Sequence, residues 1–168
     1  MGWDLSAFRT KSPVTSIDGL TEDDLVPLQR QQIMTELAVI AKACDAQLDT
    51  NDPTWLIMQT DAWIVEFGLG KREPLITMGL HVRGDKEPKE VFAYLVHECG
   101  MQLLEWSTGE FFDLSKQSNF REWQQWRERA LADWGSSDGY QKVSYSDSRI
   151  AVGHANIGDA KLYFMFAD

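Results

Sequence analysis

Three short runs of strand-forming residues in the middle of the chain constrain the fold more than any other feature of the sequence. The runs are residues 55–59, 62–69 and 75–83, and turn-forming residues separate them. Between the first two runs, Thr60 and Asp61 have the spacing of a tight hairpin. In the third run, one face carries only apolar side chains, which are Ile76, Met78, Leu80 and Val82. These runs predict neighbouring strands of one sheet.

Two segments with helical spacing flank these strands. From residue 28 to about residue 47, apolar side chains recur every three or four positions, and Asn51-Asp52-Pro53 follows as a stop. A second helix is predicted to begin at Pro88, and Gly100 has the position of a left-handed C-terminal cap. Its apolar stripe consists of Val91, Phe92, Leu95, Val96 and Cys99.

Two further strands complete the predicted core. Residues 2–9 and 102–106 are the strand-like segments, whereas residues 10–27 contain several chain-breaking residues and are predicted to be a polar loop. The resulting order is β-α-β-β-β-α-β. Such an order is typical of an α+β fold, here a mostly antiparallel sheet with helices on one face.

The rest of the chain predicts a helix and strands that extend this core. Ser118 is a suitable cap for a tryptophan-rich helix that Gly135 would end. Three strand-like segments follow, at residues 140–145, 149–154 and 161–166. We therefore predict a single α+β domain over residues 1–168, with residues 1–115 as its core and residues 116–168 as the extension.

The charge of the chain is strongly acidic and unevenly distributed. The 168 residues have a formal net charge of -10. Residues 1–70 carry 11 acidic and 4 basic side chains, whereas residues 71–168 carry 15 and 12. The acidic region around Glu22, with Asp23 and Asp24, belongs to the first part. One interpretation is solubility, and the other is a surface that steers a basic partner protein.

Composition argues against several classes of function. An acidic chain is poorly suited to bind nucleic acid or an anionic membrane surface, because both require basic side chains. No apolar run approaches the roughly 18 residues of a membrane span, and no secretory signal is recognisable at the start. Two cysteines, Cys44 and Cys99, are too few for a disulfide framework or a zinc site and suggest a cytoplasmic protein.

Motifs for catalysis or cofactor binding are absent from the sequence. There is no nucleophile elbow, no phosphate-binding loop and no zinc-protease motif. His97 and Cys99 lie two positions apart in a predicted helix and therefore point in different directions. We expect no metal, no cofactor and no catalytic residue.

One polar constellation remains, consisting of Glu66, His81 and Arg83. If the strands at residues 62–69 and 75–83 are neighbours, the three side chains share one face of the sheet. An acid, an imidazole and a guanidinium could serve a small hydrolase or isomerase. The same residues also form ordinary cross-strand ion pairs on a solvated face.

Trp126 is a second candidate for binding. The spacing of the last helix places it partly off the apolar stripe, beside Arg127 and Arg129. An exposed tryptophan beside arginines resembles an interface anchor, either for a partner or for a homo-oligomer.

Several motifs, in this order, resemble a family of small uncharacterised bacterial proteins over residues 1–115. They are Trp3-Asp4-Leu5, Asp52-Pro53-x-Trp55, Ile64-x-Glu66-Phe67, Leu80-His81-Val82-Arg83-Gly84 and Ser107-Thr108-Gly109-Glu110-Phe111-Phe112. That family has no established activity, so the resemblance implies no catalytic residues. It implies a bacterial, cytoplasmic, single-domain protein. Small acidic proteins of this kind look like immunity proteins of secreted toxins. The sequence therefore favours a non-catalytic module that binds a protein, such as a basic toxin domain.

Overall fold

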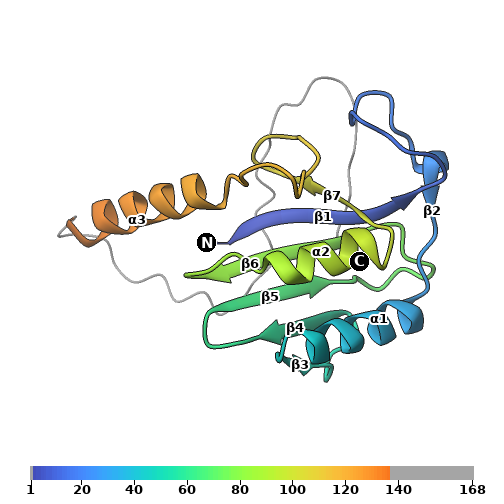
Figure 1. Cartoon of the computed structure of the whole chain (residues 1–168), viewed down its shortest axis with the longest axis horizontal. Coiled ribbons are helices and arrows are strands. Elements are labelled where there is room, and N and C mark those ends of the chain that lie inside the picture. Colours follow the sequence, from blue (N-terminus) through green and yellow to red (C-terminus); the bar gives the residue numbers. More distant parts are fainter. Residues whose placement is uncertain (1, 137–168) are drawn as a thin grey trace.

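The computed structural model describes residues 2–136 (Figure 1). Its elements are β1 (Trp3–Thr10), the 3-10 helix η1 (Glu22–Asp24), β2 (Leu25–Val26), α1 (Arg30–Ala43), β3 (Gln47–Asp49), β4 (Trp55–Gln59), β5 (Trp63–Gly68), β6 (Met78–Gly84), α2 (Lys89–His97), β7 (Gln102–Glu105) and α3 (Phe120–Ser136). The predicted strands at residues 140–145, 149–154 and 161–166 lie outside the described residues.

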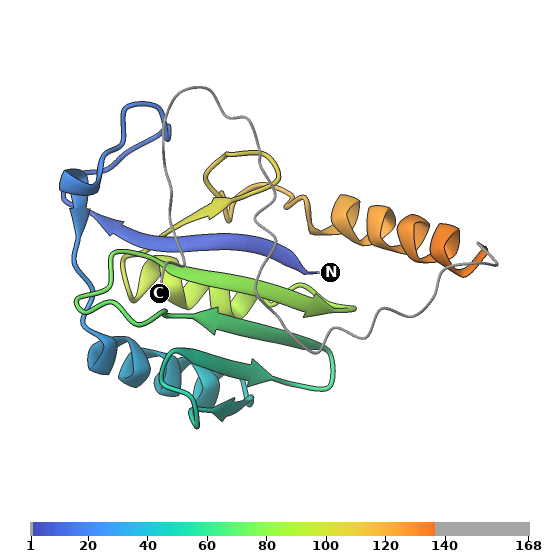
Figure 2. The ribbon, with the colours of Figure 1, turned by 180° about the vertical axis from the view of Figure 1, so that it is seen from behind.

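The seven strands form one antiparallel sheet, which confirms the predicted α+β class (Figure 2). Along the sheet the order is β2-β1-β6-β5-β4-β3, and β7 also pairs with β1. The chain's first strand thus pairs with strands from much later in the sequence. Leu5 lies opposite Leu80 of β6 and also opposite Glu105 of β7. This long-range pairing positions the N-terminal residues of the candidate site described below.

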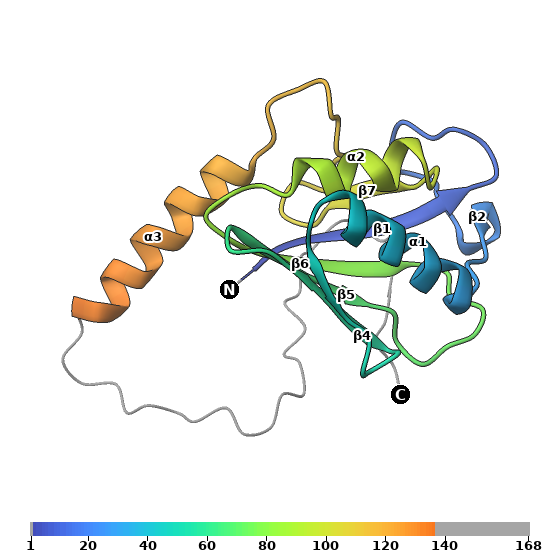
Figure 3. The same cartoon turned by 60° about the horizontal axis from the view of Figure 1, so that its bottom comes forward.

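Helices α1 and α2 lie together on one face of the sheet, as predicted (Figure 3). Their apolar stripes pack on alternate residues of β1, β4, β5 and β6, because side chains alternate between the two faces of a strand. The fully buried side chains that these strands turn toward the helices are Trp3, Leu5, Ala7, Leu56, Met58, Val65, Phe67, Met78, Leu80 and Val82. From α1 and α2 the buried side chains include Ile33, Leu37, Ile40, Val91, Phe92 and Leu95.

Two short strands and a helix end differ from the sequence-based expectation. α1 was predicted to reach about residue 47 but ends at Ala43. Asp45 adopts a φ of 51°, in the left-handed region, where a right-handed helix cannot continue. The chain then forms β3, which was not predicted. The predicted loop at residues 10–27 contains two short elements, η1 and β2. The two residues of β2 pair with the end of β1.

The second helix and its end agree with the prediction more closely. α2 follows Pro88, which is its N-cap, and Gly100 has a φ of 63° after the helix. α3 continues to Ser136, one residue beyond the glycine expected to end it. Figures 1 and 3 show α3 extending away from the sheet. Within residues 2–136, no helix is both long and apolar enough to cross a bilayer.

Candidate functional site

The sheet face turned away from α1 and α2, here called the open face, carries the candidate site. Strand alternation places polar and aromatic side chains there, opposite the buried positions. The open face includes Asp4, Ser6, Asp49, Trp55, Ile57, Glu66, His81 and Arg83, together with Trp106, whose side chain bonds to Ser6. Among residues 2–136, the helices that pack on the sheet occupy the other face.

His81 lies at the centre of the open face. In the strand register it is opposite Glu66 on one side and opposite Asp4 on the other. Its Nδ1 lies 2.6 Å from Oδ1 of Asp4. A carboxylate can only accept a hydrogen bond, so the Nδ1–H of His81 is the donor. The bond fixes both the ring orientation and the position of its proton.

Two tryptophans hold the His81 ring from either side. The Trp55 ring stacks on it, with centroids 5.2 Å apart and planes inclined by 24°. Trp106 meets it edge-on at 6.4 Å, and its Nε1–H donates to Oγ of Ser6 at 2.8 Å. Aromatic contacts of this kind contribute about 0.5–1.5 kcal/mol each beyond area burial. The centre of the open face is therefore held in place by side-chain contacts.

Glu66 and Arg83 complete the cluster with an ion pair. Nη2 of Arg83 lies 3.1 Å from Oε2 of Glu66. The arginine side chain is 53% exposed and the glutamate side chain 14%. The structure thus brings Glu66, His81 and Arg83 onto one face, as the alternation predicted. However, His81 bonds to Asp4 rather than to Glu66, and Asp4, Trp55 and Trp106 were not among the predicted site residues.

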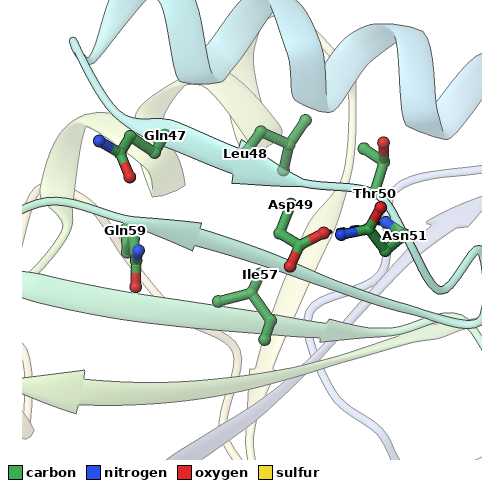
Figure 4. Close-up of a pocket in the computed structure, with 7 residues that line it drawn as sticks. All are labelled: Gln47, Leu48, Asp49, Thr50, Asn51, Ile57 and Gln59. Atoms are coloured by element: carbon green, nitrogen blue, oxygen red, sulfur yellow. Dashed lines mark hydrogen bonds between the residues drawn. The ribbon is translucent and has the colours of Figure 1, made fainter.

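A shallow hollow of about 380 Å³ lies at the β3–β4 edge of the sheet (Figure 4). Gln47 and Asp49 of β3 face Gln59 and Ile57 of β4 across it. Oδ1 of Asp49 accepts the backbone N–H of Asn51 at 2.9 Å. None of the described residues that line the hollow is basic, and we interpret it as the polar margin of the open face.

The hydrogen-bond partners of His81 define the chemistry at the centre of the open face. Within residues 2–136, the side-chain bonds of His81 reach Asp4 only, so no nucleophile is paired with its imidazole. No group of three or more histidine, cysteine, aspartate or glutamate residues in this range could hold a metal ion. What the open face offers is a rigid aromatic and acidic surface.

The two cysteines are also weak nucleophiles. Burial, with the nearby Glu36 carboxylate, raises the pKa of the Cys99 thiol to about 11. Burial likewise raises the pKa of Cys44 above its ordinary value of 9.0. A thiol reacts as its thiolate, so a raised pKa lowers its reactivity at neutral pH.

The raised pKa predicts slow alkylation of Cys99 in the native protein. At pH 8 the native thiol carries roughly one hundredth of the thiolate of an ordinary thiol. Iodoacetamide should therefore alkylate Cys99 about 100-fold more slowly in the native protein than in urea. The native rate should rise about tenfold per pH unit up to pH ~10. Mass spectrometry of the Cys99 peptide measures both rates, and equal rates at pH 8 would contradict the prediction.

The two other candidates from the sequence lie elsewhere. Trp126 is half exposed on α3, the helix that extends away from the sheet (Figure 1). In the acidic region, Glu22 pairs with Arg72 at 2.5 Å. Hydrogen bonds from the Thr21 side chain and backbone lower the pKa of Asp24. Two of the three carboxylates thus already have partners within the chain.

Comparison with protein-family models, characterised proteins and solved structures finds no match. The resemblance to a bacterial family therefore stays a prediction.

Proposed function

We propose that the protein is a non-catalytic module that binds a basic partner protein through its open face. The supporting observation is the fixed cluster in which Trp55 and Trp106 flank the His81–Asp4 pair. Aromatic side chains that are already held in place lose little conformational entropy on binding and are common interface hot spots. Inhibition of a secreted toxin by an immunity-type protein in the bacterial cytoplasm is the specific role we favour.

Charge supports a basic partner. The chain has a net charge of -10, and residues 1–70 contribute the larger part. On the open face, Arg83 is already paired with Glu66, so Asp4 and Asp49 leave the face acidic. Such a surface accelerates association with a basic protein and opposes association with nucleic acid.

The test combines partner capture with variants of the open face. A partner co-purified from the source cells is identified by mass spectrometry and then titrated as a pure protein. Trp55→Ala and Trp106→Ala should each weaken its affinity by tenfold or more. Trp126→Ala, on α3, should change it by less than twofold. Thermal unfolding verifies that each variant is folded.

Salt dependence provides a second readout. Affinity for the partner should fall about tenfold between 50 and 500 mM salt, mainly through a slower association rate. Unchanged affinity in the Trp55 and Trp106 variants would reject the open face as the interface. Salt-independent affinity would reject electrostatic steering.

A hydrolase or isomerase is the second candidate, and the 2.6 Å Asp4–His81 pair is the observation in its favour. A carboxylate that orients a histidine is common in general base catalysis. His81→Ala separates the two proposals. An enzyme would lose turnover while keeping its fold, whereas a binding module would show no turnover with or without His81.

A further inference from the structure

We propose that the open face receives an arginine side chain of the partner, stacked on the exposed face of Trp106 and beside the Asp4–His81 pair. This inference rests on the proposed function and specifies the chemistry of its central contact. A guanidinium needs a flat surface to stack on and acceptors that its N–H groups can reach. Both are present at this point of the sheet.

Trp106 supplies the flat surface. The residue is 42% exposed, although its Nε1–H donates to Oγ of Ser6 and its backbone N–H donates to the Asp4 carbonyl at 3.1 Å. Because both bonds hold the residue, the accessible face of the ring is presented in one orientation. A cation over such a face gains about 0.5–2 kcal/mol.

Asp4 and His81 supply the acceptors. When the imidazole is neutral and donates its Nδ1 proton to Asp4, Nε2 of His81 is left as an acceptor. Only Oδ1 of Asp4 is bonded to a side chain within residues 2–136, which leaves Oδ2 to accept a second bond. The Asp4 side chain is 36% exposed and that of His81 is 23% exposed, so an incoming group can reach both.

The neighbouring charges favour a cation at this position. Glu66 neutralises Arg83, and Asp4 places a further carboxylate on the same face. Arginine fits better than lysine. Its planar group stacks on an aromatic ring and directs several N–H donors in fixed directions, whereas an ammonium does neither.

Peptide titrations followed by NMR test the inference directly. The probe is a capped Gly-Arg-Gly peptide, and the matched controls replace arginine with citrulline, which has the same shape without the charge, or with lysine. The arginine peptide should shift the Trp106 indole N–H signal and bind at least tenfold more tightly than the citrulline peptide. The lysine peptide should bind with intermediate affinity.

Variants localise the contact. Asp4→Asn should lower the affinity for the arginine peptide at least fivefold. Asp49→Asn, in β3 on the same face, should leave that affinity unchanged. Equal binding of the arginine and citrulline peptides, or equal loss in both variants, would overturn the inference.

A failure of the arginine site and a failure of the proposed interface give different results. If the arginine peptide does not bind in preference to its controls, but Trp55→Ala and Trp106→Ala still weaken partner binding, the arginine site is wrong and the proposed interface is supported. If the arginine peptide binds at Trp106 but the affinity for the partner is unchanged in both tryptophan variants, the proposed interface is wrong, although the face does bind arginine.

Discussion

Replacing Glu105 with alanine is expected to lower the free energy of unfolding by about 3 kcal/mol. This carboxylate is 4% exposed and lies on the helix-covered face of the sheet, opposite Leu5. It accepts three hydrogen bonds, from Trp3 Nε1 at 2.8 Å, Ser107 Oγ at 2.5 Å and Asn119 Nδ2 at 3.0 Å. Alanine would leave these donors without their acceptor and would create a cavity.

Urea unfolding followed by circular dichroism measures the effect. Glu110→Ala is the matched control, because Glu110 lies just after the turn that follows β7 but is exposed, and its cost should stay within about 0.5 kcal/mol. Glu105→Gln keeps one acceptor oxygen, and its loss of unfolding free energy should lie between those of the two alanine variants. A Glu105→Ala protein as stable as the Glu110 control would show that the buried network contributes nothing.

The central hairpin was predictable because its signal is local. Residues 55–59 were expected as a strand and form β4 with the same limits. Apolar alternation also identified the buried side of β6, where Met78, Leu80 and Val82 face the core. Where one face of a strand is buried, a period of two is imposed on the sequence itself.

The short edge strands were not predictable, because their partners define them. β3 has three residues and pairs with β4, and β2 has two residues and pairs with the end of β1. Segments this short contain too few positions to show a period. The positive φ of Asp45, which ends α1 early, also leaves no pattern in neighbouring residues.

The candidate site was predictable only in part, for a similar reason. Glu66, His81 and Arg83 lie on two strands that are close in sequence, so alternation placed them on one face. Asp4 contacts His81 across 77 positions of sequence. Placing it there requires the register between β1 and β6, which no local pattern specifies. Its position on the polar side of the first strand was the available signal.

Replacing Gly84 with alanine is expected to lower the free energy of unfolding by about 3–5 kcal/mol. Gly84 ends β6 with a φ of +120°, a backbone angle that residues other than glycine rarely adopt. A Cβ built there would lie 2.5 Å from the carbonyl oxygen of Ala62 and 2.7 Å from Cα of Trp63. Both obstacles are backbone atoms, so rotating a side chain cannot relieve the clash.

The clash would act on the register that builds the open face. Gly84 pairs with Trp63, in the same ladder that places Glu66 opposite His81. Gly70→Ala is the matched control. Gly70 also has a positive φ, +61°, but nothing lies within 4 Å of its added Cβ, so the cost should be only about 1 kcal/mol. Similar losses in the two variants, measured by urea unfolding, would show that backbone conformation alone, rather than the close approach of β5 and β6, requires glycine at position 84.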